Sequence, residues 1–218
     1  MGGRSGCVNC YAEATSKWLV GMNNVRYKNG FNVTIHEDLV DGPFNWRSSQ
    51  RVFVCGMTDI FHDDIPDDII QRMFKNMNQA TLHTFLFTTK RSERLKQMDK
   101  DGLLKWSDNI WAGVTVENMK RRYRIDDLIG TGASLKYLLV EPLLEEVDLS
   151  PWLKNIDWVV LGGESGPRAR PIEADWVRKV RDDCITAKVP LYFKQWGGRR
   201  RKSAGNELDG QHWHQFPA

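Results

Sequence analysis

Charged or strongly polar residues stand at the ends of six short apolar runs along this chain. The runs span residues 51–59, 84–91, 110–117, 136–141, 157–164 and 191–195. A strand that is buried on both faces has no physical reason to end on a charged residue unless the charged ends of several strands lie together in one polar site. Carboxylates and ammonium groups gathered there could bind the hydroxyl, ammonium or phosphate groups of a small molecule. The candidate ligand-binding residues are Asp59, Lys90, Glu117, Glu141, Gly162, Gly163, Glu164 and Lys194.

Two interpretations of this set stay open, because opposite charges can also neutralise one another in a structural ion-pair network. Gly162 and Gly163 belong to the set because glycine lets backbone amides approach a ligand closely. A tight turn after a strand is the alternative for them. Arg168 and Arg170 follow at once and would suit a carboxylate or a phosphate. The sequence identifies no catalytic residue.

Cys7 and Cys10 are separated by two residues, a spacing at which two thiolates can hold one metal centre or form a redox disulfide. They are the candidate metal ligands. Cys55 lies within an apolar run and Cys184 on an apolar helix face, so both are expected in the core. Cys55 is also the first candidate for an additional metal ligand, because it lies near the end of the run that leads to Asp59. Four cysteines do not make a disulfide framework in 218 residues, and we therefore expect reduced thiols and a cytoplasmic protein.

The elements that position these residues follow from the hydrophobic pattern. The apolar runs are rich in Val, Phe and Leu and alternate with helical patterns, which is typical of parallel strands buried on both faces. Helices are expected at 10–22, 65–77, 92–105, 118–129 and 173–188, with a long polar connection at 23–50 that could hold a minor hairpin. The fold class is therefore α/β, an incomplete parallel (β/α) barrel, in which active sites lie at the C-terminal ends of the strands. Tryptophans in or beside apolar segments are expected to pack: Trp18, Trp106, Trp152, Trp158 and Trp176.

Composition limits the domain organisation and the partners. With 41% hydrophobic residues, the chain can form one sizeable barrel domain over 1–198, followed by a basic tail or hairpin at 199–218 packed on the same domain. The net charge of +3 does not demand a nucleic-acid partner. A basic run could nevertheless contact phosphates, and it consists of Arg199, Arg200, Arg201 and Lys202. No run approaches the ~18 apolar residues of a membrane span, and no signal-peptide pattern begins the chain.

Motifs along the chain resemble those of a radical-SAM-like family with three cysteines that is common in phages and prophages. They are Ser5-Gly-Cys-Val-Asn-Cys-Tyr-Ala-Glu13, Cys55-Gly-Met-Thr-Asp-Ile-Phe-His62, Thr88-Thr-Lys-Arg91, Gly113-Val-Thr-Val-Glu-Asn118, Val140-Glu-Pro-Leu-Leu144, Gly162-Gly-Glu-Ser-Gly-Pro-Arg-Ala-Arg-Pro171, Phe193-Lys-Gln-Trp-Gly197 and Leu208-Asp-Gly210. The resemblance covers nearly the whole chain in the right order. It implies a partial barrel of the radical-SAM type and, for a phage-encoded protein, the cytoplasm of the host cell.

The resemblance also implies two cofactors, a [4Fe–4S] cluster held in part by Cys7 and Cys10, and S-adenosylmethionine. It places Lys90, Glu117 and Glu164 in the cofactor pocket. The family pattern resembles C-x6-C-x2-C after a first barrel strand, whereas here the first cysteine would precede Met1 and that strand is missing. Because such a cluster needs three protein thiolates, we expect this chain to bind it weakly or not at all.

Three functional hypotheses follow. The first is a radical-SAM-like enzyme that uses an iron–sulfur cluster and S-adenosylmethionine on an unknown substrate. The alternative is a degenerate barrel without a cluster that binds nucleic acid or a partner protein. A third is a zinc-stabilised fold in which Cys7 and Cys10 form a structural site shared across a dimer.

Overall fold

The structure is a computed structural model that describes residues 8–200 and 203–217. Cys7, Arg201 and Lys202 therefore lie outside the described residues. The chain divides into two compact units. The N-terminal unit comprises residues 10–112 and 130–135, and the described part of the C-terminal unit comprises residues 8–9, 113–129, 136–200 and 203–217.

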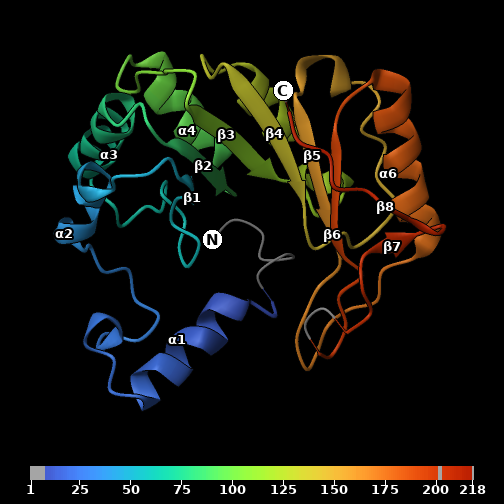
Figure 1. Cartoon of the computed structure of the whole chain (residues 1–218), viewed down its shortest axis with the longest axis horizontal. Coiled ribbons are helices and arrows are strands. Elements are labelled where there is room, and N and C mark those ends of the chain that lie inside the picture. Colours follow the sequence, from blue (N-terminus) through green and yellow to red (C-terminus); the bar gives the residue numbers. More distant parts are fainter. Residues whose placement is uncertain (1–7, 201–202, 218) are drawn as a thin grey trace. The chain divides into compact units, whose positions relative to one another are not determined.

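Six strands form one parallel sheet in chain order, β1-β2-β3-β4-β5-β6. They span Arg51–Phe53, Thr84–Thr89, Ile110–Thr115, Leu135–Val140, Trp158–Gly162 and Leu191–Gln195. Each connection carries the chain from one strand to the next in the order, as in an incomplete parallel (β/α) barrel (Figure 1). The predicted α/β class and the parallel sheet are thus confirmed.

The N-terminal unit contains β1, β2, the start of β3 and six helical segments. These are α1 (Tyr11–Gly21), η2 (Val25–Tyr27), α2 (Glu37–Val40), η3 (Gly42–Asn45), α3 (Asp67–Gln79) and α4 (Ser92–Lys100). Its core is aromatic: the ring of Phe74 on α3 lies 5.8 Å from Phe87 of β2 and 5.1 Å from Trp106, centroid to centroid. This packing holds α3 against β2 because edge-to-face ring pairs add to the burial of the apolar surface.

The C-terminal unit contains the end of β3, then η4 (Met119–Arg121), α5 (Tyr123–Ile129), β4, η5 (Leu153–Asn155), β5, α6 (Ala174–Ala187) and β6. A glycine is required on β3, since a Cβ at Gly113 would lie 2.4 Å from Cζ of Tyr137. The crossover before β5 holds only the short η5, as the limited space between residues 141 and 157 predicts.

A two-stranded hairpin, β7 (Glu207–Leu208) and β8 (Gln211–His212), follows β6. Its turn consists of Asp209 and Gly210, both with positive φ (52° and 76°), a conformation that aspartate and glycine adopt in tight hairpin turns. The hairpin is tied to α6, because Arg178 and Arg181 both donate to the Asp209 carboxylate.

Some local predictions were wrong. The segment 23–50 holds η2, α2 and η3 and no strand among its residues, all of which are described. Trp18 does not pack, since it is 62% exposed, while Ala12 and Ser16 form the buried side of α1. The pattern of α1 indicates a helix correctly, but its large apolar side chains face away from its buried side. In the described part of the chain, no helix is both long and apolar enough to cross a membrane.

Candidate functional site

Asp59 anchors the end of β2 in the N-terminal unit. Its carboxylate accepts hydrogen bonds from the Thr89 hydroxyl (2.7 Å), the Lys90 backbone amide (3.0 Å) and the Arg91 guanidinium (3.3 Å). It also accepts from the amide of Phe61 at 3.0 Å, which shapes its own loop. With these four donors, Asp59 joins the loop after β1 to the end of β2, so a structural role accounts for its charge.

The thiols of the N-terminal unit do not gather into a metal site. Cys10 is half-buried just before α1, and the neighbouring Tyr11 hydroxyl donates to the backbone carbonyl of Gly56. Burial raises the pKa of the Cys55 thiol to about 12, so this thiol stays protonated at neutral pH. Among the described residues, no three His, Cys, Asp or Glu side chains form a group that could hold a metal ion.

Glu117 follows β3 in the C-terminal unit and lies in the core, with a side chain that is 1% exposed. Arg124 of α5, 4% exposed, donates to its carboxylate at 3.0 Å and to the Thr115 carbonyl at 2.8 Å. Arg124 thereby fastens the first turn of α5 to the end of β3. A fully buried pair of this kind is a structural element, because neither charge is accessible to a ligand.

Glu164 organises the loop that follows β5. Its side chain is 6% exposed and accepts from Arg170 Nε (2.9 Å), Arg170 Nη2 (2.6 Å) and the Asn9 amide (3.0 Å). Burial alone would raise the pKa of Glu164, but the hydrogen bonds from Arg170 and Asn9 outweigh it and lower the pKa below its usual value. The pKa of Arg170 is raised, chiefly by the hydrogen bond to Glu164 and in part by the charge of Glu117.

Glu141 and Lys194 form a solvent-accessible charged pair at the strand ends of the C-terminal unit. The Glu141 carboxylate at the end of β4 accepts from Lys194 Nζ at 2.8 Å and from the Gln195 amide at 3.2 Å. The two side chains meet across β5, at the position of Gly162. A Cβ at Gly162 would lie 3.3 Å from Glu141 Oε1, so a larger residue there would crowd the carboxylate. The side chains of Glu141 and Lys194 are 16% and 41% exposed, so a ligand can reach both charges.

A β-bulge directs Lys194 outward. Phe193 pairs with Leu161, but Gln195 pairs with Gly162, so β6 carries one extra residue at this point. The bulge leaves Lys194 exposed and Gln195 buried, and bulges next to functional sites commonly redirect side chains in this way. Gln195 donates to the Ser165 hydroxyl at 2.9 Å, while its Oε1 is buried and has no hydrogen-bond partner among the described residues.

The backbones that follow β5 and β6 touch one another. A Cβ at Gly163 would lie 2.0 Å from the Trp196 carbonyl oxygen, and one at Gly197 would lie 2.2 Å from the Glu164 carbonyl oxygen. Gly198 donates to the Glu164 carbonyl at 2.8 Å and accepts from the Gly166 amide at 3.0 Å. Gly163 after β5 and Gly197 after β6 therefore serve this close approach, which for Gly163 is the structural alternative to backbone contact with a ligand.

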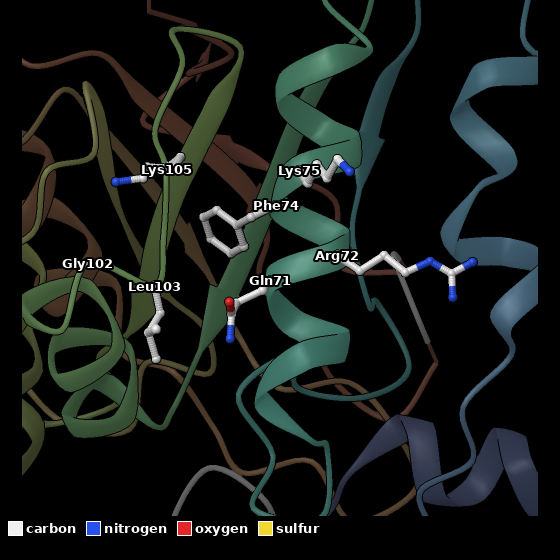
Figure 2. Close-up of a pocket in the computed structure, with 7 residues that line it drawn as sticks. All are labelled: Gln71, Arg72, Phe74, Lys75, Gly102, Leu103 and Lys105. Atoms are coloured by element: carbon white, nitrogen blue, oxygen red, sulfur yellow. The ribbon is translucent and has the colours of Figure 1, made fainter.

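One hollow of about 370 Å³ lies elsewhere, between α3 and the loop after α4 in the N-terminal unit. Figure 2 shows the Phe74 ring directed toward that loop, whereas the charged ends of Arg72 and Lys75 point away from the ring. Arg72 instead pairs with Glu37 and Asp41. Because its charged groups diverge, this hollow does not form a polar ligand site.

The predicted site residues fall into both units. Asp59, Lys90 and Cys10 belong to the N-terminal unit, whereas Glu117, Glu141, Gly162, Gly163, Glu164 and Lys194 belong to the C-terminal unit. Within the C-terminal unit the structure pairs Glu141 with Lys194, while Glu117 and Glu164 pair with Arg124 and Arg170. That all the strand-end charges share one ligand stays a prediction.

Sequence reasoning missed Arg124, Asn9 and Gln195. Arg124 lies in a basic stretch that predicts a solvated helix face, and nothing in the sequence distinguishes it from Arg121 or Arg122. Strand alternation does not identify Gln195, because the bulge brings both Lys194 and Gln195 within hydrogen-bond distance of the Glu141 carboxylate.

Comparison with known proteins gave one result. A family model with the description "Protein of unknown function (DUF5131)" matches residues 4–217. Searches of the curated proteins and of the solved structures found no match.

Proposed function

The chain belongs to the DUF5131 family, described as a protein of unknown function, and we propose that it is a radical-SAM-like protein that binds S-adenosylmethionine at the C-terminal ends of its strands. The support is threefold: the motifs quoted above, the parallel sheet in chain order, and the charged pair that follows β4 and β6. In folds of this kind ligands bind where the parallel strands end.

The observation that carries the proposal is the solvent-accessible pair of Glu141 and Lys194, of which Lys194 is the more exposed partner. S-adenosylmethionine has an amino-acid part with one ammonium and one carboxylate group. A carboxylate and an ammonium 2.8 Å apart at the end of a sheet match this zwitterion, since each ligand charge finds its opposite. Gly162 supports the match, because it leaves no side chain between the two residues.

The described residues do not fit an iron–sulfur cluster. The described thiols of the N-terminal unit are Cys10 and Cys55, and burial raises the pKa of Cys55 to about 12. No group of three possible ligands exists in the part of the chain that the structure describes. We therefore derive no reaction step through a cluster, and the proposed roles are limited to binding. Glu141 holds the ligand ammonium, Lys194 holds its carboxylate, and Glu164 keeps the Arg170 loop in place.

Isothermal titration calorimetry with S-adenosylmethionine tests the proposal. Glu141→Gln and Lys194→Met should each weaken binding about tenfold or more, because a hydrogen bond to a charged group contributes about 1.5–3 kcal/mol. Glu146→Gln is the matched control, since it removes an exposed carboxylate from the same loop. Melting temperatures within a few degrees of wild type would show that the variants are folded. Absence of binding to the wild-type chain, or unchanged binding by both test variants, would refute the site.

A further inference from the structure

The two loops that follow β5 and β6 carry an excess of positive charge. Residues 165–172, 196–200 and 203–206, which we call the basic double loop, contain no Asp or Glu. They contain four cationic residues, Arg168, Arg170, Arg199 and Arg200. The nearest acids along the chain are Glu164, Glu173 and Glu207. Since Glu164 forms an ion pair with Arg170, little negative charge remains to neutralise the other arginines.

Arginines elsewhere in this protein usually have acidic partners. Arg26, Arg72, Arg94 and Arg178 all make surface ion pairs. By contrast, Arg168, Arg199 and Arg200 are exposed and have no ion pair with any described residue. Exposed cations without counter-charges keep their full attraction for an anion in solution.

Backbone contacts hold the two loops of the basic double loop together and so fix the positions from which the arginine side chains extend. The loops leave the neighbouring parallel strands β5 and β6 at the same edge (Figure 1). Beyond the strand ends, Ser165 forms a β-bridge with Gly198. The backbone contacts at Gly163 and Gly197 allow no side chain between the loops. Arg168 is fixed through its carbonyl, which accepts from Asn9 at 2.8 Å. The described arginines are therefore presented by one connected pair of backbones.

We propose that the basic double loop binds the phosphodiester backbone of a nucleic acid, with Arg168, Arg199 and Arg200 as phosphate contacts. All four cationic residues of the basic double loop are arginines. This favours phosphate, because the planar guanidinium donates to two phosphate oxygens at once. Contacts of this kind position a strand without reading its sequence. Nucleic acid would thus be the partner at the same edge, the C-terminal ends of the strands, where the proposed function places S-adenosylmethionine.

The test is fluorescence anisotropy with a labelled single-stranded DNA of mixed sequence, at several salt concentrations and without S-adenosylmethionine. Wild type should bind with an affinity that falls as salt rises. The double variant Arg199→Gln/Arg200→Gln should bind more weakly, and the slope of log K against log salt should decrease by about 1.4, or about 0.7 per lost contact. Arg168→Gln, 31 residues away in sequence, should decrease it by about 0.7. Unchanged melting temperatures would show that these exposed substitutions leave the fold intact.

The matched control is Lys154→Gln/Lys188→Asn. It removes two exposed cations from η5 and the end of α6, which precede β5 and β6 and so lie at the opposite edge. Asparagine suits position 188, where φ is 58°. The control should bind DNA as wild type does. Equal losses in control and test variants would overturn the proposal, as would absence of DNA binding at low salt. Competition by polyglutamate as effective as that by unlabelled DNA would also overturn it in favour of an acidic protein partner. Because no adenosyl ligand is present, failure here leaves the proposed function standing.

Discussion

At the scale of single residues, exposure separates the charges that support the fold from those that can meet a ligand. Glu117 and Arg124 are almost completely buried, whereas Glu141 and Lys194 keep contact with solvent. Glu117 and Glu141 both follow parallel strands and look alike in the sequence. Removing one partner of a buried pair leaves an unpaired charge in the core, while a partly exposed charge can exchange its partner for water or for a ligand.

Arg124→Met should therefore destabilise the protein by about 3–5 kcal/mol, the usual effect of breaking a buried ion pair. Urea denaturation followed by circular dichroism measures this difference. Arg122→Met is the matched control, since Arg122 is exposed two positions away, and it should change the free energy of unfolding by less than about 0.5 kcal/mol. Equal stability of the two variants would show that the Glu117 pair does not support the fold.

The residue types at the strand ends could be predicted from the sequence, but most of their partners could not. The sequence places Glu164 at the end of a strand, and Arg170 six residues later is a visible candidate partner. Glu141 and Lys194 are 53 residues apart and meet only because their strands flank β5. The partner of a charge depends on strand order and register, which the hydrophobic pattern of a single strand does not contain.

At the scale of elements, the β7–β8 hairpin depends on one carboxylate. Arg178 and Arg181 lower the pKa of Asp209 to about 2 by hydrogen bonds and charge. A carboxyl group whose pKa is lower in the folded state adds stability above its unfolded pKa of about 3.9. That stability is lost as pH falls from about 4 to about 2. The hairpin should thus stay attached to α6 at pH 4 and loosen near pH 2.

Two-dimensional NMR can follow this loosening through the backbone amides of Gly210 and Gln211. In the wild-type protein their chemical shifts should titrate with a midpoint near pH 2, in line with the pKa of Asp209. Asp209→Asn should abolish the transition, and Glu207→Gln, in the same hairpin, should leave it unchanged. A midpoint near pH 4 in the wild type would mean that the two arginines do not bind Asp209 in solution.

Elements with a strong apolar period were predicted well, and those without one were not. The helix predicted at 173–188 is α6, Ala174–Ala187, and the strand expected from residue 84 is β2, Thr84–Thr89. The segment 23–50 lacks a period, and its short helical turns depend on tertiary contacts such as that of Asp41 with Arg72. Trp18 was misplaced because helical spacing shows that a stripe exists but not which side of the helix is buried.

At the scale of the whole molecule, the order of the strands determines which strand ends lie next to one another. Parallel strands in chain order put the loops after β4, β5 and β6 at one edge of the C-terminal unit. Glu141 and the basic double loop belong to these loops, and Lys194, the partner of Glu141, lies near the end of β6. We infer that this edge of the C-terminal unit binds both the small ligand and the nucleic acid, which would bring a strand to the place where the adenosyl ligand lies.

Hydrogen–deuterium exchange with and without S-adenosylmethionine locates the ligand without a substitution. If the ligand binds at the strand ends, exchange should become slower in the segments 141–145, 162–166 and 194–198, at the C-terminal ends of β4, β5 and β6. The segments 153–157 and 187–190, which precede β5 and β6, should exchange at unchanged rates. Protection confined to the hollow between α3 and residues 102–105, or no protection at saturating ligand, would rule out binding at the strand ends.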